Sequence, residues 1–442
     1  VRVCEACYGD MMRYQLIDIL RGTQISKKYK EFFRTSYTPN SLKKQQLNKL
    51  ASLLLFLRHS NLYYKELLFK FSLSEIRNNP QKVVSALPIA DKPFIIKNMN
   101  ALFQAAPNRK YQAKHTGGST GTPLRYYVDL DAISASWAYI LWSWHKYANY
   151  SPGIPFTTIA GSSLGSLRNK IQIKIYHALQ NNYFIQGDLI SPNMNFRPKR
   201  IKKAKILYGY PSAILAFIDV KSKAFDRHNL RAVFTTSEQL LPNVRKTIEA
   251  HLRVPVYDIY GANDGGLISC ECSMHNGFHY DPLNCYIEEF KNEDGETELL
   301  LTSLNSLCLP FIRYRVGDVA NIEDFGVCKC GDPYPMIRNL SGRTRDLIIL
   351  NNGNKVHGSK FNKIFSHYPE IRRYRILQTE NYDIHFKLDV NNFGSWMESN
   401  QRKALVADIE EIIGDKAEFN LEELTIKNFG LNKFKLIESH VH

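Results

Sequence analysis

The sequence is poor in the patterns that assign a location or a function directly. It contains no internal repeat and no low-complexity tract, and its longest uncharged aromatic-rich run, residues 133–144, is shorter than the about 20 residues needed to cross a bilayer. No signal-peptide pattern is present near the first residue, because Arg2, Glu5 and Asp10 interrupt the apolar stretches. We therefore expect a cytoplasmic protein without a transmembrane segment.

Cysteine is scarce as well, at eight of 442 residues, and no nucleic-acid-binding module accompanies the basic composition. The net charge of +16 arises from 58 basic against 42 acidic residues, and the excess is spread over short groups such as residues 197–205. We interpret this excess as a solvated basic surface and expect no nucleic-acid partner. A basic face would still help to gather ATP, an acidic substrate or an anionic membrane surface. Nothing in the sequence indicates the oligomeric state.

The length and the hydrophobic content of 44% predict a large buried core, and 442 residues exceed what one core usually serves, so we expect two or more domains. Short strand-like runs, among them residues 156–160, 232–235 and 256–259, alternate with helical stretches. This alternation predicts an α/β fold in which loops at strand ends carry the functional site. Aromatic residues between positions 129 and 147 indicate a helix packed into the core.

A stretch rich in glycine and hydroxyl groups at residues 115–123, His-Thr-Gly-Gly-Ser-Thr-Gly-Thr-Pro, is the most informative part of the chain. Glycines let consecutive backbone N–H groups turn toward one centre, where they attract anionic oxygens, and the hydroxyl groups add donors. The stretch lacks the Gly-Lys-Ser/Thr ending of a Walker loop and the pattern of a dinucleotide fingerprint. It is either a phosphate-binding loop or an ordinary polar hairpin before the strand-like residues 124–130.

The order of this stretch resembles the phosphate-binding loop of the adenylate-forming enzymes, and the residues leading into it resemble those of phenylacetate-CoA ligases and capsular-polysaccharide ligase-like proteins. The resemblance implies the α/β adenylate-forming enzyme fold, with a large N-terminal domain at residues 1–342 and a small mobile C-terminal α+β domain at residues 343–442. It assigns the nucleotide phosphates to the loop and a catalytic role to Thr116. The loop residues concerned are Thr116, Gly117, Gly118, Ser119, Thr120 and Gly121.

Two further motifs follow strand-like runs and match the family in order. One resembles the turn beside the adenine, and the other resembles Tyr-Gly-x-Thr/Ser-Glu, with Asn263 and Asp264 in place of the hydroxyl residue and the glutamate. The resemblance implies that Tyr260 covers the adenine and that Asp264 holds Mg²⁺ against phosphate oxygens, a role suited to hard oxygen ligands. The residues of the two motifs are Ser237, Glu238, Gln239, Tyr260, Gly261, Asn263 and Asp264.

Three motifs toward the end of the chain complete the family order. The resemblance implies that Asp318, in Arg-Tyr-Arg-Val-Gly-Asp, accepts hydrogen bonds from the ribose hydroxyls, and that Arg343, in Gly-Arg-Thr-Arg-Asp, reaches ribose or phosphate. Arg345 stands at the position of the family's domain hinge. Lys433 resembles the catalytic lysine that bridges the substrate carboxylate and the α-phosphate, and Lys435 is a second candidate for this role.

Cysteine and histidine gather in one part of this otherwise cysteine-poor chain. Cys-Glu-Cys at residues 270–272 and two histidines precede Cys-Lys-Cys-Gly at residues 328–331. A set of four ligands made of thiolates and imidazole suits tetrahedral zinc. Phenylacetate-CoA ligase-like proteins have a similar pattern, which implies a structural zinc in an insertion of the large domain. Buried free cysteines are the other interpretation. The favoured ligands are Cys272, His279, Cys328 and Cys330, with Cys270 and His275 as alternatives.

The motifs together predict an ATP-dependent ligase that activates a small carboxylic acid. The carboxylate attacks the α-phosphate of ATP, pyrophosphate leaves, and the acyl-adenylate passes to CoA or to an amine on a sugar or amino acid. Lys433, Mg²⁺ and the glycine-rich loop neutralise the charge that develops as two anions meet. The alternative is a nucleotide-binding protein without ligase activity, which the departures at Asn263, Asp264 and Asn432 motivate. No residue indicates which acid is activated.

Overall fold

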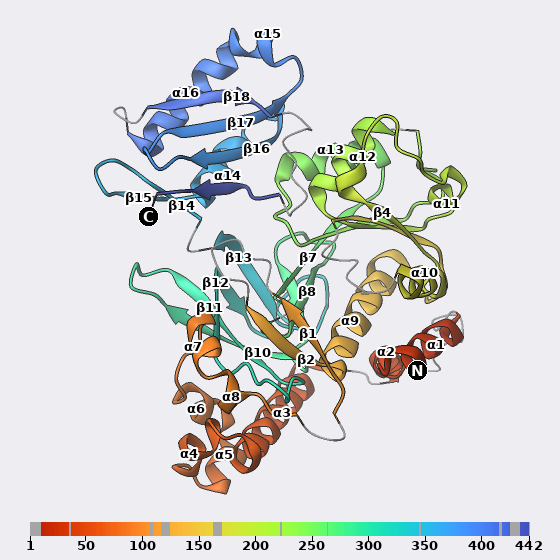
Figure 1. The fold of residues 1–442 in the computed structure, drawn as a ribbon, viewed down its shortest axis with the longest axis vertical. Coiled ribbons are helices and arrows are strands. Elements are labelled where there is room, and N and C mark those ends of the chain that lie inside the picture. Colours follow the sequence, from red (N-terminus) through yellow and green to blue (C-terminus); the bar gives the residue numbers. More distant parts are fainter. Residues whose placement is uncertain are drawn as a thin grey trace. The chain divides into compact units, whose positions relative to one another are not determined.

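The structure is a computed structural model, and it describes residues 10–34, 37–105, 109–115, 124–161, 170–221, 223–262, 264–343, 346–414, 418–424 and 434–441. Contacts divide the chain into two compact units. Unit 1 contains residues 1–154 and 259–340, and unit 2 contains residues 155–258 and 341–442. The strands β7 (Val256–Ala262) and β13 (Met336–Arg343) run across the unit boundaries (Figure 1).

The first part of unit 1 is helical (Figure 1). Its longest helix follows Thr38, whose hydroxyl accepts a hydrogen bond from the Ser41 backbone N–H, and Pro39 occupies the first helical position, where no donor is needed. Five of its leucines are buried and recur at helical spacing, namely Leu42, Leu50, Leu53, Leu54 and Leu57. The helices are α1 (Met11–Arg21), α2 (Ile25–Arg34), α3 (Pro39–Ser60), α4 (Tyr64–Phe69), α5 (Leu73–Asn78), α6 (Pro80–Ser85), α7 (Lys92–Lys97), α8 (Met99–Leu102) and α9 (Leu130–Ala148).

The strands of unit 1 form a hairpin, β1–β2, and a sheet in the order β10-β11-β12-β13-β9-β8-β7. Within this sheet the pairings β10–β11, β11–β12, β13–β9, β9–β8 and β8–β7 are antiparallel. The strands are β1 (Tyr111–His115), β2 (Arg125–Asp129), β8 (Leu267–Glu271), β9 (Phe278–Tyr280), β10 (Cys285–Lys291), β11 (Thr297–Ser303) and β12 (Tyr314–Glu323). The hairpin β1–β2 therefore flanks the glycine-rich stretch that the sequence singled out.

The first segment of unit 2 has the predicted α/β alternation. Strands β6, β5, β3 and β4 lie in that order and pair in parallel. Every residue of β3 and of β6 is buried, as expected for parallel strands covered on both faces. The elements are β3 (Phe156–Ala160), α10 (Lys170–Leu179), β4 (Asn182–Gln186), the 3-10 turn η3 (Gly187–Leu189), α11 (Pro198–Lys202), β5 (Ile206–Gly209), α12 (Pro211–Val220), β6 (Ala232–Thr236) and α13 (Pro242–Leu252).

The second segment of unit 2 is an α+β arrangement. Four strands lie in the order β18-β17-β16-β19, with β16–β17 antiparallel and the two outer pairings parallel (Figure 1). A second hairpin, β14–β15, precedes them. The elements are β14 (Leu347–Ile349), β15 (Lys355–His357), α14 (Ser359–Ser366), β16 (Ile371–Gln378), β17 (Ile384–Val390), α15 (Phe393–Met397), α16 (Asn400–Ile413), β18 (Phe419–Glu423) and β19 (Ile437–Ser439).

Polar contacts join the two segments of unit 2. The side-chain amide of Asn243, on α13, donates to the backbone carbonyls of Phe365, Tyr368 and Ile371 at 3.0, 3.0 and 2.9 Å. Asn243 is buried, so each of these bonds satisfies a carbonyl that water does not reach. The α/β class is confirmed, whereas the boundary at residues 342 and 343 between a large and a small mobile domain stays a prediction. Among the described residues no helix has the length and apolar character needed to span a membrane.

Candidate functional site

Two residues from separate motifs that the sequence assigned to the nucleotide touch in unit 1. The hydroxyl of Tyr260, near the end of β7, donates to Oδ2 of Asp318, on β12, at 2.6 Å. Asp318 is buried, and Tyr260 also contacts the Phe278 ring edge-on, with the centroids 6.0 Å apart. The bond fixes the orientation of the carboxylate because the tyrosine ring is held in turn by its neighbour. The bond joins motifs that are 58 residues apart in sequence and lie on strands β7 and β12, which are not neighbours in the sheet.

The turn that carries Asp264 lies close to β11. A Cβ on Gly265 would meet Leu301 Cδ1 at 2.4 Å, and Gly266 has a φ of +73° with Ser303 Oγ 2.5 Å from an ideal Cβ. Both positions therefore require glycine. The backbone after β7 is thus held close to β11, and Asp264 in this turn is half-buried.

Lys114 is a charged residue near Asp264 that the sequence interpretation missed. It lies on β1 two residues before Thr116, and its partner across the hairpin is Tyr126, which is buried. Burial and the charge of Arg21 lower the pKa of Lys114, the carboxylate of Asp264 acts in the opposite direction, and the resulting pKa is about 8. Burial also raises the pKa of Tyr126, and Asp264 adds to that rise. Lysine, tyrosine and aspartate thus share one electrostatic environment.

In unit 2, Glu238 bonds to two backbone amides from distant parts of the chain. Its Oε2 accepts from the Ser212 N–H, at the start of α12, at 3.2 Å, and its Oε1 accepts from the Phe434 N–H at 2.8 Å. The neighbouring Ser237 has a positive φ of 73°, which makes the turn after β6 tight. Gln239 lies in the same turn. Glu238 therefore joins the predicted adenine turn to the residue that follows Lys433.

Two arginines of the Arg-Tyr-Arg-Val-Gly-Asp motif have structural partners. Arg315 bonds to Glu298 through two nitrogens, each at 2.6 Å, and the Glu298 carboxylate is fully buried. Arg313 donates to the Leu87 carbonyl at 2.7 Å and forms an ion pair with Glu288 at 3.2 Å. These bonds hold β12, the strand that also carries Asp318, in place.

Several predicted residues lie outside the described residues, and no position is given for them. The Arg343 side chain is among these, although its backbone ends β13. The others are Thr116, Gly117, Gly118, Ser119, Thr120, Gly121, Asn263, Arg345 and Lys433.

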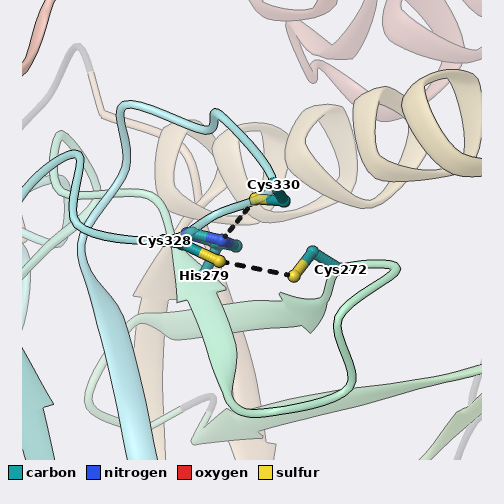
Figure 2. Close-up of side chains that lie close together, drawn as sticks. All are labelled: Cys272, His279, Cys328 and Cys330. Carbon is teal, nitrogen blue, oxygen red and sulfur yellow. Dashed lines mark hydrogen bonds between the residues drawn. The ribbon is translucent and has the colours of Figure 1, made fainter.

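The four favoured metal ligands come together in unit 1. Figure 2 shows Cys272, which follows β8, and His279, on β9, beside two cysteines of the loop between β12 and β13. One ligand atom from each side chain lies within 4.8 Å of all the others. The Sγ atoms of Cys272 and Cys328 are 3.8 Å apart, and His279 Nε2 is 3.2 Å from Cys330 Sγ. A tetrahedron with arms of about 2.3 Å has edges of about 3.8 Å, so the spacing fits zinc.

The surroundings of this cluster orient its ligands. His279 is buried, and its Nδ1 lies 3.0 Å from the Tyr334 carbonyl, so Nδ1 carries the hydrogen and Nε2 faces the cysteines with its lone pair. The Asp332 N–H donates to Cys330 Sγ at 3.4 Å. Burial lowers the pKa of His279, which favours the neutral, metal-binding imidazole, and raises the pKa of the Cys330 thiol to about 12.

The two alternative ligands lie outside the cluster, as far as the described residues extend. Cys270 is buried on β8 and pairs in register with His279, but its thiol is not among the four grouped ligand atoms. His275 pairs instead with Glu271, Nδ1 to Oε2, at 3.3 Å. The set of three cysteines and one histidine is thus the arrangement that the sequence favoured, and the ion itself stays a prediction.

The chain is similar to several curated proteins, although no model of a known protein family matches it. Protein CapK of Staphylococcus aureus is 21% identical over 353 residues, which cover 75% of this chain and 77% of CapK. The phenylacetate-coenzyme A ligase of Pseudomonas putida is 24% identical, covering 46% of this chain and 49% of the ligase. Indoleacetate–lysine synthetase of Pseudomonas savastanoi is 28% identical, covering 35% and 42%. The last two alignments span less than half of each relative.

Solved structures give the fold. A 2-hydroxyisobutyryl-CoA ligase in the postadenylation state, in complex with R3-HIB-AMP, matches 90% of this chain and 89% of its own with a TM-score of 0.65 and 15% identity. The fold is therefore that of the adenylate-forming ligases, which confirms the predicted fold class. In sequence the chain is thus similar to CapK and to phenylacetate-coenzyme A ligases, as the order of its motifs predicted, and in fold it is similar to an adenylate-forming ligase.

Proposed function

We propose that the protein is an AMP-forming ligase that uses ATP to activate a small carboxylic acid. The acid's carboxylate displaces pyrophosphate from the α-phosphate of ATP, and the resulting acyl-adenylate passes its acyl group to CoA or to an amine. The observation that carries this proposal is the hydrogen bond from Tyr260 to Asp318. It pairs the residue assigned to the adenine with the residue assigned to the ribose, in a chain that has the adenylate-forming fold.

The residues have separate tasks in this proposal. The Asp318 carboxylate accepts hydrogen bonds from the ribose hydroxyls, and Tyr260, which bonds to it, lies along the adenine. Asp264 would hold Mg²⁺ against phosphate oxygens, and the ion would supply positive charge there. Lys433 supplies a positive charge between the two reacting anions, and the glycine-rich stretch binds the phosphates through its amides. Arg343 reaches ribose or phosphate, and Arg345 acts as the hinge of the C-terminal domain.

The acceptor is a thiol or an amine. Relatives of both kinds support the proposal, because one is a phenylacetate-coenzyme A ligase and another is an indoleacetate–lysine synthetase. Similarity to CapK over three quarters of the chain favours a role in polysaccharide biosynthesis, in which the acceptor is an amine on a sugar or amino acid. Such a ligase would work in the cytoplasm, where ATP and CoA are available.

A structural zinc completes the proposal. Three thiols and one imidazole nitrogen at tetrahedral spacing fit zinc, and four protein ligands leave no open position for catalysis. The ion would hold the Cys328–Cys330 loop against β8 and β9 and take no part in the reaction.

The test is exchange of labelled pyrophosphate into ATP with a panel of aromatic, aliphatic and sugar acids. Exchange that depends on one of these acids is the expected result, and mass spectrometry with CoA, amino acids and amino sugars then identifies the acceptor. Nucleotide binding without exchange for any acid would overturn the ligase and favour a nucleotide-binding protein instead.

A further inference from the structure

A buried carboxylate lies beside the cysteine–histidine cluster without being one of its four grouped ligands. Asp332 follows Cys330 by two residues, and its side chain is fully buried. Its backbone N–H donates to Cys330 Sγ at 3.4 Å, and its Oδ1 accepts from the Tyr334 N–H at 3.3 Å. The Tyr334 carbonyl in turn lies 3.0 Å from His279 Nδ1. Asp332 is thus bonded to one ligand and to the residue that orients another.

The second oxygen of this carboxylate is held by helix α9. Asp332 Oδ2 accepts from the Lys146 ammonium and from the Tyr147 hydroxyl, the latter at 3.3 Å. Lys146 Nζ also lies 5.0 Å from the centroid of the Trp142 ring and 5.6 Å from that of Tyr147. Two aromatic rings and a carboxylate therefore hold this cation in place. Helix α9 passes beside the loop that carries Cys330 (Figure 2).

The charges explain why an ion pair stands at this position. Three thiolates around Zn²⁺ have a net charge of −1 (two minus three), and an unpaired Asp332 carboxylate would bring the local charge to −2. Buried charge without a partner is costly, and a like charge nearby disfavours the thiolate form of cysteine. The Lys146 ammonium cancels the charge of Asp332. The site then keeps the carboxylate as a hydrogen-bond acceptor without a second negative charge.

We propose that Lys146 is a positioning residue of the metal site, which balances Asp332 so that this buried carboxylate can orient the Cys330 loop beside three thiolates. Residues that hold metal ligands from outside affect the affinity strongly, and loss of one typically lowers it about 10- to 100-fold. A role in packing alone fits less well, because Asp332 is bonded to Cys330 itself. The inference rests on the proposed structural zinc and is independent of the ligase activity.

Zinc affinity of the full chain, measured by competition with a chromophoric chelator, tests this inference. Lys146→Met should lower the affinity about tenfold or more, because Asp332 is left buried and unpaired beside the thiolates. Asp332→Asn removes the charge at constant shape and should weaken binding less, since the part-exposed Lys146 ammonium reaches water. The double variant Lys146→Met/Asp332→Asn should bind zinc as tightly as Asp332→Asn, because no unpaired charge remains. Such rescue is not expected of a residue that only packs.

Lys329→Met is the matched control. Lys329 lies between two ligands in sequence but is exposed, so removal of its charge should change the zinc affinity by about twofold at most. The inference is overturned if Lys146→Met binds zinc as the natural protein does, or if the double variant binds it no better than Lys146→Met.

Folding of each variant is followed by circular dichroism. If Lys146→Met alone does not fold, a double variant that folds and binds zinc supports the inference, and a double variant that also fails to fold overturns it. If the natural protein binds no zinc, the structural zinc is wrong and this inference falls with it, whereas zinc binding unaffected by Lys146→Met overturns this inference alone.

Discussion

The Glu238 carboxylate accepts a 2.8 Å hydrogen bond from the backbone amide of Phe434, across 196 residues of sequence. Both residues belong to unit 2, and the same carboxylate also accepts from the Ser212 amide at the start of α12. Phe434 directly follows Lys433, the lysine assigned to catalysis. A single acidic side chain thus links the predicted adenine turn, the N-terminus of α12 and the end of the chain that carries the lysine.

Replacing Glu238 by glutamine should slow adenylate formation. Glutamine keeps the length of the side chain but leaves one carbonyl oxygen for two amide donors and removes the charge, and a hydrogen bond to a charged group contributes about 1.5–3 kcal/mol. We expect ATP–pyrophosphate exchange to fall about tenfold or more. Transfer of the acyl group from a supplied acyl-adenylate should change less, because that step follows the loss of pyrophosphate.

Glu249→Gln is the matched control for this change. Glu249 Oε1 accepts from the Val256 amide at 3.1 Å, so this carboxylate also holds backbone in unit 2, but at the start of β7 and not at Phe434. If both variants lose exchange activity and thermal stability equally, the role of Glu238 is structural only.

Lys433→Ala should abolish adenylate formation and leave ATP binding nearly intact. The lysine acts on charge that develops during transfer, so its removal affects the rate of exchange and not the affinity for nucleotide. Exchange and ATP binding are measured separately, the latter by calorimetry. Lys435→Ala is the control, because Lys435 lies 3.6 Å from Glu438 in an ion pair. Normal exchange in the Lys433 variant, together with loss of exchange in the Lys435 variant, would transfer the role to Lys435.

The sequence predicted the parts of the molecule that local patterns determine. The α/β class follows from the alternation of short apolar runs with helical stretches, and the adenylate-forming fold follows from the order of the motifs. Cys272, His279, Cys328 and Cys330 were foreseen as a group, because ligand type and spacing within each pair are local properties.

Contacts that depend on register and burial were not predictable. Lys114 shares the electrostatic environment of Asp264, and the β1–β2 hairpin pairs it with Tyr126 and leaves it half-buried; no motif marks that register. The motif of residues 313–318 drew attention to Asp318 and left its arginines unassigned, and Arg315 is bonded to the buried Glu298. A partner 17 residues away on a neighbouring strand is a product of sheet pairing, which a single sequence does not specify.

Purified, reduced protein should contain about one zinc per chain, and Cys328→Ser should remove it. Loss of one thiolate from a four-ligand site releases the ion, and structural zinc contributes directly to folding. We expect the melting temperature to fall by about 5 °C or more. Metal content is measured by mass spectrometry and stability by calorimetry.

Cys308→Ser is the control that distinguishes loss of the metal from replacement of a buried thiol. Cys308 is fully buried but lies outside the four-residue cluster. Its replacement should lower the melting temperature without changing the zinc content. An absence of zinc from the natural protein, freshly purified under reducing conditions, would contradict the assignment.

Asp264→Asn should raise the Mg²⁺ concentration needed for half-maximal exchange, by about tenfold or more, because it removes a charged oxygen ligand at nearly constant size. Asp264→Glu restores the family's residue and should remain active. Titration of exchange activity with Mg²⁺ compares the three proteins. An active asparagine variant at limiting Mg²⁺, together with an inactive glutamate variant, would mean that other groups hold the ion.

The natural protein should become more stable relative to a Lys114→Met variant as the pH rises above about 8. Burial lowers the pKa of Lys114 from the ordinary 10.5 to about 8 in the folded state. Below pH 8 the amine is charged in both states, and the folded protein carries the full cost of burying that charge. Between pH 8 and 10.5 the folded protein releases the proton and the unfolded chain keeps it. The unfolded chain then binds more protons, so the free energy of unfolding rises with pH.

The measurement is thermal denaturation of the natural protein and of Lys114→Met at pH 7, 8, 9 and 10. Other groups titrate in both proteins, so the difference between their melting temperatures isolates Lys114. It should move by a few degrees in favour of the natural protein between pH 8 and pH 10, since about 1 kcal/mol shifts the melting temperature of a domain this size by about 2–4 °C. Lys44→Met, at an exposed lysine of α3, should differ from the natural protein by a constant amount over this range. If the difference in melting temperature between the natural protein and Lys114→Met is also constant over this range, the pKa of Lys114 is not lowered in the folded state. The amine would then be solvated.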